Sequence, residues 1–480
     1  MERRSYKNLN STDFSGQRVL IMGLGLHGGG LESARYLARH GAELTITDLR
    51  DEKKLAPSVE KLEAALGPAR IRYVLGKHDM ADFERADLVI KNPGVKPDSP
   101  YLRAARHIET DISLFLAQSP ARLIAVTGSK GKSSTASALY RVLDLARRPV
   151  PDTRTGTSGI PGGAVLPGRA WLGGNITVSP LSFLDQVGAG DDVVLELSSW
   201  QLGDLRGRIK EGGRPLLKPR CAVITAIMPD HLDWYGSMSA YVADKRVIYQ
   251  GQDREDATVA GQDPWGESFL AETGGRPLSY GDEEEAEGLN NSRGALPAKL
   301  LVPGRHQRRN LLAAALALLD LGLPAELVRE GLGSFPGIEH RLEFFHEWRG
   351  VRFYNDTAAT IPEAAAAAAA AFEGCGRLLL LAGGSDKGLG LEPLIDAAKQ
   401  AGELFLLAGT ATEKLIVLLR DRGIPFRGPF QSMETAVCAL LEQARPADIA
   451  LLSPGCASFG MFLNEFDRGT QWKETVKRLA

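Results

Sequence analysis

A glycine- and lysine-rich segment at residues 127–134 combines residue types that suit phosphate binding. It reads Thr-Gly-Ser-Lys-Gly-Lys-Ser-Ser, follows the apolar run 121–126 and precedes a helical stretch at 135–145. Glycines let backbone N–H groups turn toward an anion, and a helix N-terminus adds a positive dipole. In such a loop Lys132 reaches the outer phosphates and Ser133 binds Mg²⁺. The spacing is GxxGKS rather than GxxxxGKS, but the strand–loop–helix setting favours a nucleotide site over a structural glycine turn.

A second glycine loop lies nearer the N-terminus. Residues 23–28 read Gly-Leu-Gly-Leu-His-Gly, and Asp48 follows at the end of the next apolar run. This is the dinucleotide fingerprint, so an NAD-dependent oxidoreductase has to be considered beside a purely structural turn. The same physics suits any nucleotide diphosphate. Because the two loops begin separate domains, phosphoryl transfer from ATP onto something carried by a second nucleotide explains both.

Three polar positions follow apolar runs or lie in a helical stretch of the middle segment. Glu196 ends the run 193–196, Asp230-His231 follows the run 221–227, and Lys245 lies in the stretch 241–249. Functional groups of parallel sheets gather beyond the carboxyl ends of the strands. Each residue also has a structural interpretation, as a loop carboxylate, a turn histidine and a solvated lysine. Spacing alone does not decide between the two.

Composition limits the classes of protein. The chain has 480 residues, 44% hydrophobic and 24% charged, with a formal net charge of −2 and four widely separated cysteines. No global basic field attracts nucleic acid or an anionic membrane, and the cysteines fit a reducing cytoplasm. The polar first fifteen residues do not form a signal peptide, and every apolar run is shorter than the ~20 residues of a membrane span. We therefore expect a cytoplasmic protein.

Alternating strand and helix patterns predict an α/β protein of three domains, with boundaries near residues 119 and 337. Strands are expected at 18–22, 42–47, 71–75, 88–91, 121–126, 192–197, 221–227, 351–354, 378–381, 404–407 and 449–452. Helices are expected at 31–40, 308–321, 362–372 and 469–479. The stretches 148–174, 203–219 and 281–288 are expected to be loops because they are rich in glycine and proline or acidic.

Taken together, these residues resemble the Mur ligase family from about residue 17 to the C-terminus, with insertions near 148–170 and 203–219. The matching segments are 127–134, 173–176, 196–202, 229–233, 303–306 with Asn310, 339–343, 355–357 and 383–388. The segments 23–25 with 48–50, 91–95, and 452–459 with 468–469 resemble most closely the branch of the family that adds D-glutamate.

The resemblance implies a Rossmann-like UDP-binding domain (1–119), a central P-loop ATPase-like domain with a parallel or mixed sheet (120–337) and a Rossmann-like amino-acid-binding domain (338–480). It also implies ATP-dependent ligation of D-glutamate to UDP-N-acetylmuramoyl-L-alanine, through an acyl phosphate, by a monomer in peptidoglycan precursor synthesis. A carboxylate does not condense with an amine in water, and phosphorylation supplies a leaving group. Both reactants are anionic, so the reaction needs cations.

The same resemblance assigns roles to individual residues. Catalytic roles fall to Lys132, Asn175, Glu196, His231 and Lys245. ATP is expected at Gly128, Ser129, Lys130, Gly131, Lys132, Ser133, Ser134, Asn310, Arg341 and Asp356. Ser133 and Glu196 are expected to hold one Mg²⁺, and His231 and Lys245 a second, with Lys245 carrying a carbamate from CO₂ because Mg²⁺ prefers oxygen. Leu26, His27, Asp48 and Arg50 would hold UDP, Asn175 the muramoyl-alanine portion, and Thr360, Lys387, Ser458 and Phe459 D-glutamate.

Some positions depart from the family pattern. Ala358 replaces a lysine, and Glu465-Phe466 stands where an aromatic residue usually precedes an acid; both lie at the amino-acid end. His27, Ser113 and Gln307 also differ. The alternatives are a related ligase that adds another amino acid, such as L-glutamate, and more distantly a folylpolyglutamate synthase, the oxidoreductase or a non-catalytic nucleotide-binding scaffold. We also predict a hinge at 335–338.

Overall fold

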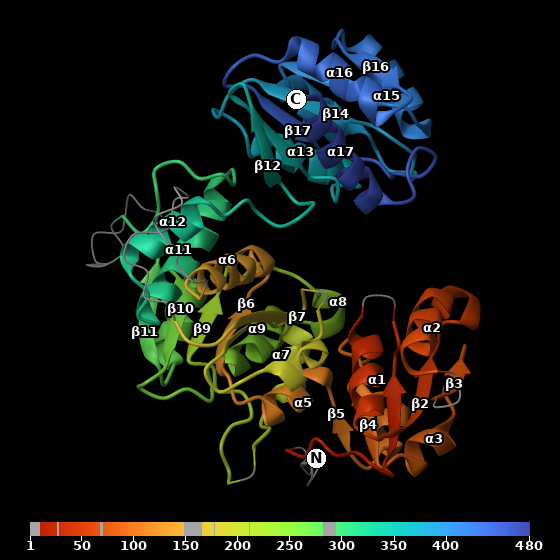
Figure 1. Cartoon of the computed structure of the whole chain (residues 1–480), viewed down its shortest axis with the longest axis vertical. Coiled ribbons are helices and arrows are strands. Elements are labelled where there is room, and N and C mark those ends of the chain that lie inside the picture. Colours follow the sequence, from red (N-terminus) through yellow and green to blue (C-terminus); the bar gives the residue numbers. More distant parts are fainter. Residues whose placement is uncertain are drawn as a thin grey trace, which may run out of the picture. The chain divides into compact units, whose positions relative to one another are not determined.

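The computed structural model describes residues 10–25, 28–67, 71–147, 166–176, 178–210, 212–281 and 294–480. The chain divides into two compact units, one of Met1–Leu296 with Asn310–Gly331 and one of Pro297–Arg309 with Leu332–Ala480. The first unit holds two β-sheets and the second holds one, each accompanied by helices (Figure 1). The expected α/β class with three sheets is confirmed, and the domain boundaries stay a prediction.

The N-terminal sheet is parallel, with the strand order β3-β2-β1-β4-β5. Its strands are β1 (Arg18–Met22), β2 (Glu43–Asp48), β3 (Ile71–Leu75), β4 (Leu88–Lys91) and β5 (Ile108–Glu109). Its helices are α1 (Gly29–Arg39), α2 (Glu52–Leu66), α3 (Met80–Arg85), α4 (Pro100–Ala104) and α5 (Asp111–Gln118). Val19 and Ile21 of β1 are buried beside Leu20 and Met22, as expected for a strand that is covered on both faces.

The central sheet is also parallel, with the strand order β11-β10-β9-β6-β8-β7. Its strands are β6 (Arg122–Thr127), β7 (Ala170–Gly174), β8 (Asp192–Glu196), β9 (Cys221–Ile224), β10 (Ala257–Gly261) and β11 (Arg276–Tyr280). The helices that follow β6 to β11 are α6 (Lys132–Leu145), α7 (Ser199–Leu205), α8 (Leu232–Tyr235), α9 (Met238–Lys245), α10 (Pro264–Glu272), α11 (Arg305–Asp320) and α12 (Ala325–Gly333). Because β6, β8 and β9 are adjacent and parallel, the segments after them meet at one edge.

The C-terminal sheet has the order β12-β13-β17-β14-β15-β16, and β12 pairs antiparallel with β13. Its strands are β12 (Glu343–Trp348), β13 (Val351–Asn355), β14 (Leu378–Ala382), β15 (Glu403–Leu407), β16 (Arg427–Phe430) and β17 (Ile449–Leu452). Its helices are α13 (Pro362–Ala370), α14 (Glu392–Gln400), α15 (Thr410–Asp421), α16 (Met433–Gln443) and α17 (Glu465–Leu479). The alanine-rich helix begins at Pro362, as predicted, because proline suits the first turn.

Two of the expected loops are partly wrong. Residues 170–174 form the edge strand β7, which pairs with β8, although their two glycines favoured a turn. Residues 203–205 complete helix α7, whose first turn is fixed by a capping box between Ser198 and Gln201. Residues 148–165 of the first expected loop lie outside the described residues, and so do residues 282–288 of the acidic run. Among the helices that are described, none has the length and apolar character to span a bilayer.

Candidate active site

The phosphate-type loop joins β6 to α6 and has a backbone that only glycine adopts readily. Gly128 has φ 149°, and a Cβ there would lie 1.9 Å from Thr225 Oγ1. Gly131 has φ 92° and caps α6. Thr225, directly after β9, donates through Oγ1 to the carbonyl of Lys130 at 2.6 Å and so anchors the loop. The sequence therefore folds into a rigid turn whose backbone N–H groups precede a helix N-terminus.

Two lysines converge on this loop. Lys132 Nζ donates to the carbonyls of Gly128 and Ser129 at 2.9 and 3.0 Å. Lys245 Nζ, from the end of α9, donates to the same Gly128 carbonyl at 2.8 Å. Burial lowers the pKa of Lys132, and the charge of Glu196 opposes that shift. The sequence predicted both lysines as site residues, and the structure brings their ammonium groups to one carbonyl.

Lys245 is almost completely buried. Its side chain is 1% exposed, and its ammonium lies 4.6 Å from the ring centroid of Tyr241. Burial, and then the charge of Lys132, lower the pKa of Lys245 to about 7. A large fraction of this amine is therefore neutral near pH 7. A neutral buried amine is nucleophilic, whereas an ordinary surface lysine is protonated.

Glu196 ends β8 and presents one oxygen that has no partner. Its side chain is 1% exposed, and Oε1 accepts a hydrogen bond from Asn175 Nδ2 at 2.8 Å. Oε2 is buried, and no hydrogen-bond donor reaches it among the described residues. A buried carboxylate oxygen is costly unless a cation or donor meets it. This orphaned oxygen fits a bound cation.

The donors near Glu196 suit magnesium. Ser133 lies in the first turn of α6, directly after Lys132. In the described part of the chain, no three His, Cys, Asp or Glu side chains gather as a metal cluster. Mg²⁺ is commonly held by one or two carboxylates together with substrate phosphates and waters, so such a cluster is not required. Glu196 and Ser133 thus fit a site that a nucleotide completes.

His231 and Asn310 flank the loop. His231 has φ 52°, its ring centroid lies 4.7 Å from that of Trp200, and its side chain is 43% exposed. Its ring centroid lies 6.4 Å from that of Tyr241, the ring that the Lys245 ammonium also contacts. Asn310 is buried, and a Cβ on Gly131 would meet its Oδ1 at 2.2 Å. The structure thus places Asn310 directly on the loop and His231 at its margin.

The other predicted residues of the loop, Ser129, Ser134 and Lys130, differ in their contacts and burial. Ser129 Oγ accepts from Met228 N at 2.9 Å and lies 2.8 Å from Tyr241 Oη, so it fixes the segment after β9. Ser134 is buried in α6. Lys130 is 71% exposed and lies 3.9 Å from Asp230.

The glycine loop of the N-terminal sheet is organised by Asp48. Its carboxylate accepts from Gly25 N at 3.2 Å and from Arg50 N at 2.9 Å. Ser58 Oγ donates to the Gly25 carbonyl at 2.9 Å, a contact that the sequence analysis missed. Asp48 and Arg50 therefore lie where β1 and β2 end. The predicted ligands Leu26 and His27 lie outside the described residues.

Asp356 lies at the end of β13 in the second unit. Its Oδ1 accepts from Leu342 N at 3.1 Å and its Oδ2 from Ser453 Oγ at 2.7 Å. Burial raises the pKa of Asp356 to about 7, although both hydrogen bonds and the charge of Arg341 oppose that shift. Arg341 itself is exposed. A carboxyl group with such a pKa is poised to respond to a bound cation or a change of pH.

Three loops of the C-terminal sheet carry the residues predicted for the amino acid, which are Thr360, Lys387, Ser458 and Phe459. Ser385 and Ala457 pair through their backbones at 2.9 and 3.1 Å, which joins the loops after β14 and β17. Gly455 N donates to the Ala359 carbonyl at 2.8 Å and joins the loop after β13. Ser458 is buried, whereas Lys387 and Phe459 are exposed.

Arg468 is a residue whose role was not predicted from the sequence. It is fully buried and donates to Thr357 Oγ1 and O, each at 3.0 Å, and to the Cys456 carbonyl at 3.1 Å. Burial lowers the pKa of Arg468 to about 10. Its guanidinium thus holds the loops after β13 and β17 together. The pair Arg468-Gly469 was noted only as a point of resemblance.

The fold and the lysine-rich loop agree with the sequence comparisons. Family models match residues 17–113 (Mur ligase MurD-like, N-terminal domain), 126–318 (Mur ligase middle domain) and 340–456 (Mur ligase, glutamate ligase domain). The chain belongs to the Mur ligase family, which confirms the resemblance drawn from the sequence.

Individual relatives carry the comparison further. The UDP-N-acetylmuramoylalanine–D-glutamate ligase of Treponema pallidum is 39% identical, over 96% of this chain and 98% of the relative. The enzyme of the same name from Roseiflexus sp. is 38% identical, over 96% and 99%. The crystal structure of UDP-N-acetylmuramate-alanine ligase MurC from Thermotoga maritima matches with a TM-score of 0.53 and 18% identity, over 97% of this chain and 100% of that chain. This last likeness concerns the fold alone.

Proposed function

We propose that this chain is an ATP-dependent ligase that joins D-glutamate to UDP-N-acetylmuramoyl-L-alanine through an acyl phosphate. The observation that carries the proposal is the meeting, at a glycine loop, of one buried and one partly buried lysine ammonium with a buried carboxylate oxygen that has no hydrogen-bond partner among the described residues. The relatives from Treponema pallidum and Roseiflexus are both named as D-glutamate ligases, which supports D-glutamate as the amino acid that is added. We place the reaction in the cytoplasm, where ATP and nucleotide-linked precursors are available, and propose that the chain acts as a monomer.

In the first half-reaction the chain positions charge. Lys132 exchanges its bonds to two carbonyls for the outer phosphates of ATP, which the N-terminus of α6 also attracts. A substrate carboxylate oxygen attacks the γ-phosphorus, the bond to the β-phosphate bridge breaks, and ADP leaves. Mg²⁺, which Glu196 and Ser133 would hold, supplies further neutralisation of phosphate charge. Asn310 packs against Gly131 and so supports the loop.

In the second half-reaction an amine displaces phosphate. The amine of D-glutamate attacks the acyl carbon, the C–O bond to phosphate breaks, and the amide forms as the nitrogen loses a proton. The chain orients the amino acid through Thr360, Lys387, Ser458 and Phe459, on loops that Arg468 ties together. Asp48 and Arg50 would position the UDP end of the acceptor, and Asn175 its muramoyl-alanine portion.

Lys245 is proposed to carry a carbamate. Burial keeps a large fraction of this amine neutral near pH 7, and only the neutral amine adds CO₂. The new N–C bond releases one proton and replaces a cation with an oxygen ligand. That exchange would relieve the repulsion from Lys132 and suit a second Mg²⁺ near His231.

The proposal is tested by crossing UDP-muramoyl acceptors with a panel of D- and L-amino acids and measuring ADP release with Mg²⁺. We expect release only when UDP-N-acetylmuramoyl-L-alanine and D-glutamate are both present. Steady turnover with L-glutamate would refute the stereochemical claim and favour a related ligase, which Ala358 keeps open. Lys132→Ala should lower kcat at least about 100-fold. Lys399→Ala, which removes an exposed lysine, serves as the matched control.

A further inference from the structure

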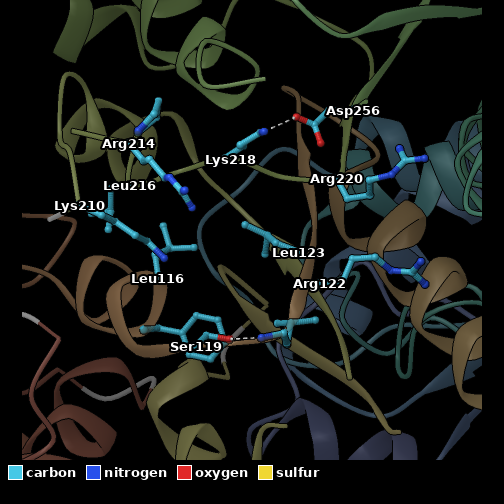
Figure 2. Close-up of a pocket in the computed structure, with 14 residues that line it drawn as sticks. Leu116, Ser119, Arg122, Leu123, Lys210, Arg214, Leu216, Lys218, Arg220 and Asp256 are labelled. Carbon is cyan, nitrogen blue, oxygen red and sulfur yellow. Dashed lines mark hydrogen bonds and ion pairs between the residues drawn. The ribbon is translucent and has the colours of Figure 1, made fainter. Parts of the chain in front are cut away.

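A cavity of about 320 Å³ lies at the amino edge of the central sheet (Figure 2). Arg122 begins β6, and Arg220 and Asp256 directly precede β9 and β10; all three line it. The phosphate-type loop follows the carboxyl end of β6, so the cavity lies at the opposite end of the same strand. It is therefore separate from the candidate active site.

Apolar side chains make up half of the lining of this cavity. Leu116 from α5, Val193 from β8 and Leu216 from the stretch 203–219 line it and are buried, and Leu123 of β6 lines it as well. A cavity of this volume is within the size range of small-molecule sites. Five of its lining residues come from the stretch 203–219, whose role the sequence did not indicate: Lys210, Arg214, Pro215, Leu216 and Lys218.

Three of the five cations that line the cavity form ion pairs with aspartates, although Asp192 also pairs with Arg147 and Asp320 with Arg276. Arg122 pairs with Asp192 at 2.5 Å, Arg220 with Asp320 at 2.9 Å, and Lys218 with Asp253 and Asp256. In Figure 2 the head groups of Arg122 and Arg220 point away from the side where Lys210 and Arg214 lie. These three cations are therefore already held by carboxylates and directed away from that side.

Lys210 and Arg214 differ from the other three. No carboxylate pairs with either side chain among the described residues. Burial lowers the pKa of Lys210, and no neighbouring charge opposes that shift. Figure 2 shows both side chains on the same side of the cavity, next to Leu216. Two cations thus lie beside the apolar side chains of the cavity, and no carboxylate of the described residues forms an ion pair with either.

The backbone fixes the spacing of these two cations. Lys210 N donates to the Arg214 carbonyl at 2.7 Å, and Gly213 N donates to the Lys210 carbonyl at 3.1 Å. Ile209 and Pro215 form an antiparallel bridge, and Leu216 N donates to the Arg208 carbonyl at 2.9 Å. These hydrogen bonds hold the backbones of Lys210 and Arg214 next to each other before any ligand binds.

We propose that this cavity binds a small phosphate monoester with an apolar body. A dianionic phosphate matches two cations with which no carboxylate of the described residues pairs, and the guanidinium of Arg214 can meet two of its oxygens at once. The apolar body would lie over Leu123, Val193 and Leu216. This assignment does not depend on the proposed ligase activity.

Calorimetric titration of the full chain with phenyl phosphate tests the site. Saturating ADP is added first, so that the phosphate-type loop is occupied. We expect binding at one site and a Kd at least about tenfold weaker in the double variant Lys210→Met/Arg214→Met. Arg214→Met alone, at an exposed position, should show part of the loss and guards against a folding defect. The control variant Lys399→Met/Arg422→Met removes two surface cations elsewhere and should bind as the wild type does.

Three results would overturn the proposal. The first is the absence of binding by the wild type at millimolar phenyl phosphate. The second is equal affinity in the wild type and in the double variant. The third is binding that disappears in Lys132→Ala but persists in Lys210→Met/Arg214→Met, which would place the phosphate in the loop before α6. Turnover of the double variant should be unchanged, because neither residue belongs to the candidate active site.

Discussion

Two lysine ammonium groups meet at the Gly128 carbonyl, and their repulsion disfavours the charged form of the more buried one, Lys245. Lys132 and Lys245 both donate to this oxygen, so two ammonium charges share a region that is buried at Lys245 and partly buried at Lys132. Coulomb repulsion is much stronger there than in water. Lys245 has the lower exposure, and its pKa falls to about 7. Lys245, rather than Lys132, is thus the lysine whose amine is more easily converted into a carbamate anion.

The first prediction concerns the pH dependence of Lys245. The neutral fraction of its amine rises as the pH passes through about 7. Carbamate formation, and with it kcat, should therefore rise between about pH 6 and 8 and then level off, and added bicarbonate should steepen the rise. Carbon-13 bicarbonate should give a carbamate signal that is lost in Lys245→Met. A rate that does not respond to bicarbonate, together with no such signal, would refute the carbamate.

The second prediction concerns Asp356, whose pKa burial raises to about 7. In the unfolded chain an aspartate titrates near pH 3.9, so between about pH 4 and 7 the native state holds a proton that the unfolded state has lost. Stability therefore falls as pH rises through this window, and the cost persists above it. Asp356→Asn removes the cost and should raise the free energy of unfolding by on the order of 2 kcal/mol at pH 8 relative to pH 5.

Thermal unfolding of the full chain at pH 5 and pH 8 measures this difference. A change in midpoint that is the same at both values would contradict the raised pKa. Ser453→Ala removes the hydrogen bond to Asp356 Oδ2 without removing the carboxyl group and serves as the comparison. The same Asn variant should lose ligase activity if Asp356 contacts ATP.

Many individual residues of the candidate site could be predicted because they lie in short contiguous sequence motifs. The loop 127–134 brings glycines, Lys132 and Ser133 together by local geometry alone. The pairing of Asn175 with Glu196 depends on β7 lying beside β8, a contact between distant segments. Arg468 could not be assigned because its partners, Thr357 and Cys456, come from other loops. Long-range packing of this kind leaves no local pattern.

Most strands with continuous apolar runs were predicted correctly, and most strands at sheet edges were missed. Strands β1, β4 and β17 match their predicted bounds closely, because buried parallel strands are apolar on both faces. The partly buried edge strand β3 was also predicted. The missed strands are the edge strands β5, β7, β11, β12 and β16 and the buried interior strand β10. β16 reads Arg-Gly-Pro-Phe and is mostly exposed, so neither propensity nor alternation indicated a strand. Its pairing with β15 decides its conformation.

The third prediction concerns the ion pair between β4 and α7. Lys91 Nζ lies 2.5 Å from Asp204 Oδ2, and both side chains are almost completely buried. Removing one member leaves the other charge buried without its partner, which costs about 3–5 kcal/mol. Lys91→Met should therefore lower the unfolding midpoint strongly. The double variant Lys91→Met/Asp204→Leu should recover much of the loss.

A denaturation series on the wild type, both single variants and the double variant checks this coupling. Additive losses would show that the two charges act independently, against the prediction. Arg72→Met, which removes the exposed partner of Asp82, provides a surface comparison and should cost less than about 1 kcal/mol.

At the scale of the whole molecule, the chain forms two compact units, and predicted ATP ligands occur in both. Asn310 belongs to one unit and Asp356 to the other. The sequence predicts a hinge at 335–338, beside Pro336-Gly337, that allows closure on ATP. X-ray scattering should show a smaller radius of gyration with a non-hydrolysable ATP analogue and Mg²⁺ than without them. Identical scattering in the two states would contradict the hinge.

The central claim is that the terminal phosphoryl group of ATP passes to the carboxylate of the acceptor. It is tested most directly with UDP-N-acetylmuramoyl-L-alanine labelled with oxygen-18 in its terminal carboxylate. The account predicts that each phosphate released during ligation carries one labelled oxygen, because the bond from that oxygen to the acyl carbon breaks when the amine displaces phosphate. Unlabelled phosphate from a reaction that nevertheless forms the amide would contradict the account.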